Sequence, residues 1–261
     1  MDDCDLIQRL LDAEDIETVH GECRHIAAHL GFSHFIYGAR IPAPLHKPSQ
    51  LILSGYPAEW RARYDEQEYM RIDPVVLHCL NGILPLDWDH IDRSDPLVGQ
   101  LFDEAADFGL CHGMTIPGHG PNGEFSLFSL TSDKPLPERA DARMALHWRA
   151  EWFATHIQEA VRRIAMSAAT TVRLRGEPPP KLTPRERECL RRAAGGASAS
   201  AIADELRISE RTVVYHFTRC QEKLGVRSRS QAVAHAMTLG ELQPDCYPST
   251  LGQSLLVEQA A

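Results

Sequence analysis

The 261 residues are 43% hydrophobic, enough for two folded cores, and their formal net charge of −9 argues against a protein that coats nucleic acid indiscriminately. No run of 18 apolar residues occurs, and the acidic N-terminus lacks the basic residues of a signal peptide. The seven cysteines are odd in number and include no C-x-x-C pair, so we expect reduced thiols, no metal site and a cytoplasmic protein.

The first two thirds of the chain mix helical and strand periods. Apolar residues at helical spacing from Ile16 to Leu30 predict an amphipathic helix that ends at Gly31. The further predicted elements are strands over 34–41, 51–54 and 124–131, helical residues 58–80 broken at Asp73–Pro74, a turn over 118–123, and a long helix over 139–165. Helices that flank an antiparallel sheet make an α+β domain, so we expect an N-terminal α-β-α sandwich.

A proline-rich segment divides the chain. Gly176 and the three prolines at 178–180 interrupt two helical regions, and a triple proline forms a semi-rigid spacer. We therefore expect four parts, which are a first domain over 1–165, a linker over 166–181, a second domain over 182–242 and a tail over 243–261.

The second domain has a start signal for almost every helix. Thr183-Pro184-Arg185-Glu186 forms a capping box, with proline at the first helical position. Ser198 and Ser209 can cap two further helices, and Gly225 can end the last of them in a left-handed conformation. Only Arg207-Ile208 separates one helix from the cap of the next. This layout predicts an all-α helix-turn-helix domain whose second helix can enter a DNA major groove.

The charge distribution agrees with a DNA-binding second domain. Residues 181–242 hold 11 Lys and Arg against 7 Asp and Glu, a net charge of +4, whereas residues 1–180 hold 16 against 27, a net charge of −11. A small basic module therefore accompanies a larger acidic domain, which is the charge pattern expected of a nucleic-acid-binding module.

Two sets of residues resemble a known family. The first set resembles the ligand-binding domain of LuxR-type quorum-sensing regulators and reads Tyr56-x3-Trp60-x3-Tyr64, Tyr69, Asp73-Pro74, Trp88 and Phe108-Gly109-Leu110-x2-Gly113-x-Thr115-x-Pro117-x-His119-Gly120. The second set is similar to the GerE-type helix-turn-helix of these regulators, with Glu186, Leu190 and Gly196 at hallmark positions. The resemblance spans roughly residues 30–240, with both domains in the family's order.

The resemblance implies an intracellular receptor for N-acyl-homoserine lactones that binds palindromic promoter DNA as a homodimer, with no cofactor and no membrane partner. The implied head-group residues are Tyr56, Trp60, Tyr64, Asp73, Trp88, Phe102, Ala105, Leu110, Thr115 and Ser129. The implied residues along the acyl tail are Ile36, Gly38, Val76, Cys79 and Leu127.

The chemistry of the head-group residues suits a lactone with an amide. The indole of Trp60 can only donate and fits the lactone carbonyl, Asp73 can accept from the amide N–H, and Tyr56 can donate to the amide carbonyl. Ser129 lies on the same strand face as apolar residues, which places one hydroxyl in an apolar wall. Structural roles remain open for the same residues, since aromatic residues at helical spacing pack as core and an aspartate before proline caps helices.

In the second domain the implied DNA-contacting residues are Arg211, Thr212, Val214, Tyr215, Thr218, Arg219 and Lys223. The sequence departs from the family at Val214, where a lysine is usual, at Thr218, where some members have arginine, and at Ala201, where a glutamate is usual. We therefore expect DNA binding, but we do not transfer a target sequence from the family.

Two other classes of function would require features that the sequence lacks. A phosphorylated receiver domain would require alternating β-α units and a suitable lysine, and the first 165 residues contain only Lys47 and Lys134. A hydrolase would require a nucleophile elbow or a zinc motif, and neither occurs in the sequence, so we expect no enzyme. A solitary regulator that answers to a foreign or non-lactone signal, or acts without ligand, remains the alternative.

The long helix has two possible partners. Its apolar residues Leu146, Phe153, Ile157, Val161 and Ile164 can contact a second copy or pack on the sheet of their own domain. The sequence leaves the acyl-chain length, the sign of regulation and the role of the tail undetermined.

Overall fold

The computed structural model of the chain describes residues 2–41, 49–120, 123–174, 182–238 and 240–242, which fall into two compact units, one up to residue 174 and one from residue 182. The first unit is built on an antiparallel sheet of five strands in the order β2-β1-β5-β4-β3. The strands are β1 (His34–Ile41), β2 (Ser49–Ser54), β3 (Leu86–Asp87), β4 (His112–His119) and β5 (Phe125–Ser132).

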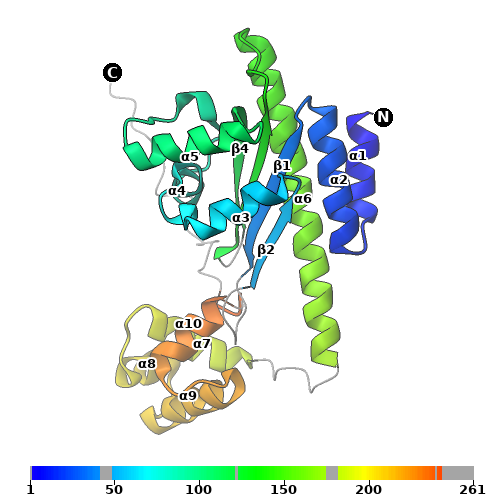
Figure 1. The fold of residues 1–261 in the computed structure, drawn as a ribbon. Helices are drawn as coiled ribbons and strands as arrows, with labels where there is room; N and C mark the ends of the chain where they lie inside the picture. The colour runs from blue at the N-terminus through cyan, green and yellow to red at the C-terminus, as the bar shows by residue number, and fades with distance from the viewer. Residues whose placement is uncertain (1, 42–48, 121–122, 175–181, 239, 243–261) are drawn as a thin grey trace, which may run out of the picture. The chain divides into compact units, whose positions relative to one another are not determined.

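Helices cover both faces of this sheet (Figure 1). One face packs against α1 (Asp3–Asp12), α2 (Ile16–His29) and α6 (Ala140–Leu174) around a large apolar core. The opposite face is covered by α3 (Ala58–Glu66), α4 (Pro74–Asn81) and α5 (Pro96–Asp107), with short 3-10 turns at Tyr69–Arg71 and Trp88–His90. The predicted α-β-α sandwich is therefore confirmed.

The strands of the first unit lie close to their predicted positions. β1 coincides with the predicted 34–41, β2 begins two residues before the predicted Leu51, and β5 ends one residue after the predicted Thr131. The turn predicted over 118–123 was partly wrong, because Gly118 and His119 still pair within β4. An added Cβ at Gly118 would lie 2.3 Å from Ser126 Oγ, so a larger residue there would displace that hydroxyl.

The predicted linker begins too early. Helix α6 continues to Leu174 and so includes nine residues that we assigned to the linker. The physical reason is composition, because residues 166–174 contain alanines and no glycine or proline, and alanine has the highest helix propensity. Residues 175–181 and the tail from 243 lie outside the described residues.

The apolar residues of α6 pack inward. Phe153 and Ile157 are fully buried and Val161 is 2% exposed, all within the core between α1, α2 and the sheet. Leu146 and Ile164 pack against the same core. The structure therefore supports packing of these side chains on the domain's own sheet.

The second unit consists of α7 (Pro184–Ala194), α8 (Ala199–Leu206), α9 (Glu210–Leu224) and α10 (Arg229–Thr238). The predicted caps are confirmed. Thr183 and Glu186 form the capping box of α7, and the Ser198 and Ser209 side chains accept from N–H groups at the starts of α8 and α9. Gly225 ends α9 with φ 65°, in the left-handed region that glycine favours. α8 and α9 form the helix-turn-helix.

An internal ion pair joins α7 to α9. Lys223 Nζ lies 2.7 Å from the Glu186 carboxylate, and their side chains are only 14% and 5% exposed. Burial alone would raise the pKa of Glu186, but the hydrogen bonds from Lys223 and from Thr183 outweigh it and lower this pKa. The carboxylate of the capping box thus also neutralises a lysine in the domain core.

We predict that Lys223→Met destabilises the protein by about 3 kcal/mol, because it leaves the buried Glu186 carboxylate without its cation. The matched control is Arg219→Met on the same helix, whose pair with Glu222 is exposed and should contribute less than about 1 kcal/mol. Urea unfolding monitored by circular dichroism measures both changes. Equal losses from the two substitutions would contradict the role of the internal pair.

The same pair predicts a pH dependence. Because the folded-state pKa of Glu186 lies below its ordinary value of 4.5, its contribution to stability is fully present above that value and is lost as the pH falls through the folded-state pKa. The stability difference between the wild type and Lys223→Met should therefore shrink on acidification in that range.

Candidate ligand cavity and DNA-binding surface

A cavity of about 300 Å³ lies in the first unit between the sheet and the layer formed by α3, α4 and α5. Twelve of the fifteen ligand-binding residues predicted from the sequence line it, namely Ile36, Gly38, Tyr56, Trp60, Tyr64, Asp73, Val76, Trp88, Phe102, Ala105, Leu127 and Ser129. These residues come from strands β1 and β5, from the 3-10 turn at Trp88 and from the α3, α4 and α5 regions, so the fold gathers them from across almost 100 positions of sequence.

Three residues that we placed at the cavity do not line it. Leu110 is fully buried in the aromatic cluster behind the cavity, because the turn at Gly109, with φ 80°, directs the chain there after α5. Thr115 is also fully buried and lies behind Ser129. Cys79 faces the protein interior on α4, where burial raises the pKa of its thiol to about 12.

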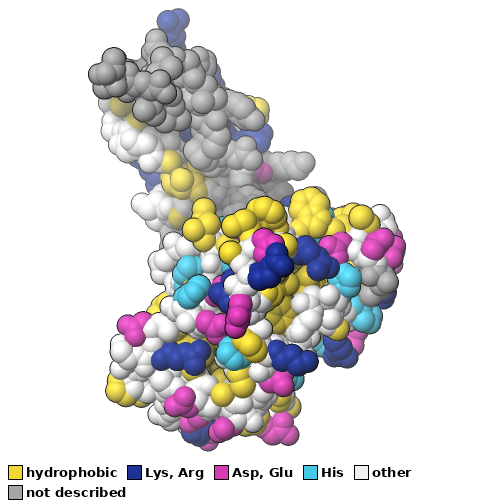
Figure 2. Space-filling view, turned by 90° about the horizontal axis from the view of Figure 1, so that it is seen from above, with side chains coloured by type: hydrophobic (Ala, Val, Ile, Leu, Met, Phe, Trp, Pro, Cys, Tyr) yellow, Lys and Arg dark blue, Asp and Glu magenta, His cyan; other side chains and the backbone are white. Residues whose placement is uncertain are grey.

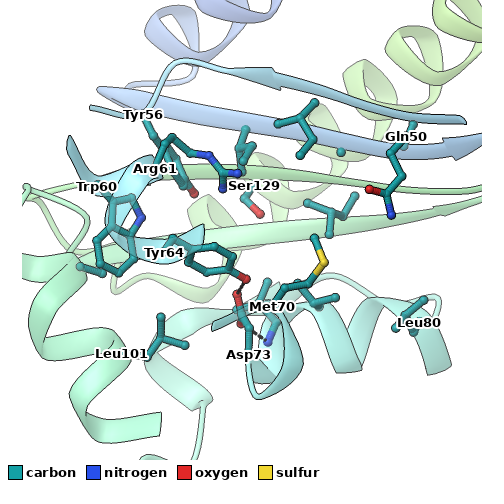
Figure 3. Close-up of a pocket in the computed structure, with 18 of the residues that line it drawn as sticks. Gln50, Tyr56, Trp60, Arg61, Tyr64, Met70, Asp73, Leu80, Leu101 and Ser129 are labelled. Carbon is teal, nitrogen blue, oxygen red and sulfur yellow. Dashed lines mark hydrogen bonds between the residues drawn. The ribbon is translucent and has the colours of Figure 1, made fainter. Parts of the chain in front are cut away.

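Asp73 combines a structural and a cavity-facing position. One of its oxygens accepts the backbone N–H of Val75 at 2.8 Å and caps α4, while the other accepts the Tyr64 hydroxyl at 2.8 Å (Figure 3). Burial raises the pKa of Asp73, against the lowering effect of these hydrogen bonds. The Asp73 carboxyl group therefore both caps a helix and lines the cavity.

Trp60 and Tyr56 bring hydrogen-bond donors to the same end of the cavity. Trp60 is 3% exposed, packs against Tyr64, Tyr69 and Phe108, and finds no acceptor for its indole N–H among the described residues. The buried Tyr56 hydroxyl likewise has no hydrogen-bond partner among them. Burial raises the pKa of Tyr56, so the phenol keeps its proton. A buried donor without a partner, such as the Tyr56 hydroxyl, is costly, and a polar ligand would relieve that cost.

A short chain of hydrogen bonds orients Ser129. The Trp88 indole N–H donates to Thr115 Oγ1 at 2.9 Å, and the Thr115 and Ser129 hydroxyls are bonded at 2.8 Å. If the Thr115 proton lies in that second bond, the Ser129 proton can point into the cavity. Thr115 therefore acts on the cavity through Ser129 rather than as part of its wall.

Several residues that line the cavity were not predicted from the sequence. Arg61 points into the cavity near Ser129 (Figure 3) and its guanidinium bonds Asp65 at 3.2 Å. Its position three residues before Tyr64 on α3 was an available signal. Met70 and Leu101 also line the wall, and Gln50 and Leu80 line the opposite end. Whether these residues face the cavity depends on strand register and on the rotation of each helix. The family resemblance included no motif that marks these positions.

Gly38 leaves space in the middle of the cavity. An added Cβ at this position would meet only Leu127 side-chain atoms, at 3.7 and 3.8 Å, which is ordinary van der Waals contact. A small side chain would therefore fit, and a large one would occupy the volume between the two ends.

The predicted DNA-contacting residues lie mostly on one exposed side of α9. Val214 and Tyr215 are about half exposed, and Arg211, Thr218 and Arg219 are exposed as well. Thr212 is half-buried and its hydroxyl bonds Ser209 at 2.7 Å. Lys223 was wrongly placed on this surface, because α9 turns its side chain toward Glu186 in the domain core.

Exposed hydrophobic side chains are gathered rather than evenly spread. Figure 2 shows them in a band on the face that it displays, beside Lys and Arg side chains. On α6, Met144, Trp148 and Trp152 are 52%, 65% and 57% exposed at helical spacing. We call these three residues the apolar stripe of α6. Large apolar patches that remain exposed mark interaction surfaces.

Metal-binding and membrane-spanning features are not found in the described part of the chain. No group of three or more His, Cys, Asp and Glu side chains there could hold a metal ion. None of its helices combines the length and apolar character needed to cross a bilayer.

Two sequence families match the two units. The autoinducer binding domain matches residues 15–161, and the bacterial regulatory proteins of the luxR family match residues 180–236. The transcriptional activator protein VanR of Vibrio anguillarum is 32% identical over 240 residues, which cover 91% of this chain and 95% of VanR. The quorum-sensing regulator RhlR of Pseudomonas aeruginosa is 33% identical over 217 residues, covering 81% and 84% of the two chains.

A solved structure agrees with the fold of the first unit. The N-acylhomoserine lactone dependent LuxR family transcription factor CepR2 of Burkholderia cenocepacia superposes with a TM-score of 0.51 at 25% identity, covering 63% of this chain and 94% of that one. The chain therefore belongs to the LuxR family and is an autoinducer-binding transcriptional regulator with a helix-turn-helix, not an enzyme.

Proposed function

We propose that the signal is an N-acyl-homoserine lactone held in the cavity of the first unit. The observation that carries this proposal is the set of polar groups at one end of the cavity, where two donors lack acceptors among the described residues and a carboxylate stands beside them. CepR2, a family member of similar fold, is itself lactone-dependent.

Each polar group has a matching partner on this ligand. Trp60 Nε1 donates to the lactone carbonyl and the Asp73 carboxylate accepts the amide N–H. Tyr56 and Ser129 donate to the amide carbonyl. The aromatic rings of Tyr64, Trp88 and Phe102 enclose the head group and exclude water, which strengthens these bonds.

For DNA, we propose that a homodimer binds a palindromic promoter site through α9. One small helix-turn-helix covers a single half-site, and two-fold pairing places half-sites about one helical turn apart. Arg211 and Arg219 suit phosphates or guanine edges, and Thr218 suits a base edge or a thymine methyl group. The apolar stripe of α6 is the surface in the first unit that we assign to the second copy.

The head-group roles predict that Trp60→Phe weakens binding of N-dodecanoyl-homoserine lactone about tenfold and Asp73→Asn at least as much, because each leaves a buried ligand group unpaired. Asparagine keeps the cap of α4 but loses the acceptor of the Tyr64 hydroxyl, so thermal unfolding of each variant checks that it remains folded. The control is Tyr69→Phe, which removes a buried hydroxyl outside the cavity wall. Isothermal titration calorimetry measures the affinities, and unchanged binding in both cavity variants would refute these roles.

The DNA-binding role predicts that Arg211→Ala weakens binding to a duplex selected from a random-sequence pool and lowers the salt slope by about 1, the amount expected for one lost phosphate contact. Lys134→Ala in the first unit should change neither quantity. Fluorescence anisotropy over a range of salt concentrations measures both. An unchanged slope in Arg211→Ala would remove this residue from the phosphate contacts.

The dimer proposal predicts that the double variant Trp148→Glu/Trp152→Glu shifts the lactone-saturated protein toward monomer, because it places two charges in an apolar contact. Leu97→Glu is the control, since Leu97 is equally exposed on α5 outside the stripe. Light scattering after size exclusion gives the mass of each. A wild-type-like dimer in the double variant would place the contact elsewhere.

A further inference from the structure

The end of the cavity farthest from Trp60 carries polar side chains to which the proposed ligand assigns no role. Arg40 and Gln50 line this end, and Figure 3 shows Gln50 across the cavity from Trp60 and Tyr56. An unsubstituted acyl chain ends in a methyl group, which gains nothing from a guanidinium or an amide. The two side chains therefore indicate that the end of the ligand tail carries a polar group.

Strand register fixes where these residues lie. Ile36, Gly38 and Arg40 alternate along β1 and line the cavity, and each pairs with residues on the neighbouring strands. Ile36 pairs with Ser129, Gly38 with Ile52 and Leu127, and Arg40 with Gln50 and Phe125. The cavity floor thus has three rows. The first contains the Ser129 hydroxyl, the second is apolar around Gly38, and the third contains the polar side chains of Arg40 and Gln50.

The rows also set a length. Four residues of β1 separate the Ser129 row from the Arg40 row, which at about 3.3 Å per residue is roughly 13 Å. An extended carbon chain advances roughly 1.25 Å per bond, given a bond of about 1.52 Å and an angle near 111°. An acyl chain whose carbonyl lies at Ser129 therefore reaches Arg40 after about ten carbons.

The polar row is available to a ligand. Arg40 and Gln50 are exposed, and no carboxylate in the described part of the chain forms an ion pair with Arg40. Glu124 lines an adjoining hollow with Arg40, but the cation that acts on it is Arg162. Arg61, the other arginine of the cavity, is already bonded to Asp65.

We propose that the signal carries an acyl chain of about ten to twelve carbons whose far end bears a hydrogen-bond acceptor, a carboxylate or a hydroxyl, that binds Arg40 and Gln50. This inference rests on the proposed lactone function and specifies the tail of that ligand. Arg40 is then a specificity-determining residue, because a guanidinium binds a carboxylate through two parallel hydrogen bonds.

The test compares three homoserine lactones with dodecanoyl, 12-hydroxydodecanoyl and 11-carboxyundecanoyl chains, by calorimetry at low salt. In the wild type we expect the carboxylate to bind about fivefold more tightly than the methyl-terminated chain, the upper range for an exposed ion pair, with the hydroxyl between them. In Arg40→Leu the preference should reverse in favour of the methyl group. Arg24→Leu on α2, which covers the opposite face of the sheet from the cavity, should retain the wild-type order.

The outcomes separate this inference from the function on which it rests. If the dodecanoyl lactone binds but the carboxyl-to-methyl ratio is the same in the wild type and Arg40→Leu, the tail inference is wrong and the lactone receptor stands. If no homoserine lactone binds the well-folded protein, both are wrong. A wild-type preference that falls as salt rises would support the ion pair, because salt screens exposed charges.

Discussion

The antiparallel register of β1 with β2 and β5 is the constraint on which the cavity depends. It places Ser129, Gly38 and Arg40 in successive rows on one sheet face and sends Phe35, Tyr37 and Phe128 to the core on the other face. Because side chains alternate along a strand, a slip of one residue would exchange the two sets. The same pairing thus builds the core beneath α6 and the floor beneath the proposed ligand.

The cavity wall opposite the sheet adds the polar groups that the proposed ligand completes. Asp73 is held by the start of α4 and by Tyr64, whereas Trp60 and Tyr56 offer hydrogen bonds that the described protein leaves unmade. A buried donor without an acceptor opposes folding, and a ligand that binds only the folded state stabilises it by mass action. The lactone would in this way supply part of the interior of its own receptor.

The helix-turn-helix was the easier half to predict, because caps such as Thr183, Ser198 and Ser209 act within a few residues of sequence. β1 and α2 were also found, since clear periodicity marks them. β4 and α5 were missed, and the inward position of Lys223 was not foreseen. These features depend on contacts between distant segments, such as the pairing of His112–His119 with β5 and the approach of Glu186 to α9. Family resemblance named most of the cavity lining, but the polar far end emerged only from strand register.

The most direct test of the receptor account is the affinity of the wild-type protein for unsubstituted lactones from C4 to C14. If the acyl chain lies along the three rows, each added methylene should tighten binding by about 0.8 kcal/mol, roughly fourfold, until the chain reaches the Arg40 row, after which the gain should stop. An affinity that does not change with chain length would show that the tail lies outside the cavity and would contradict the account.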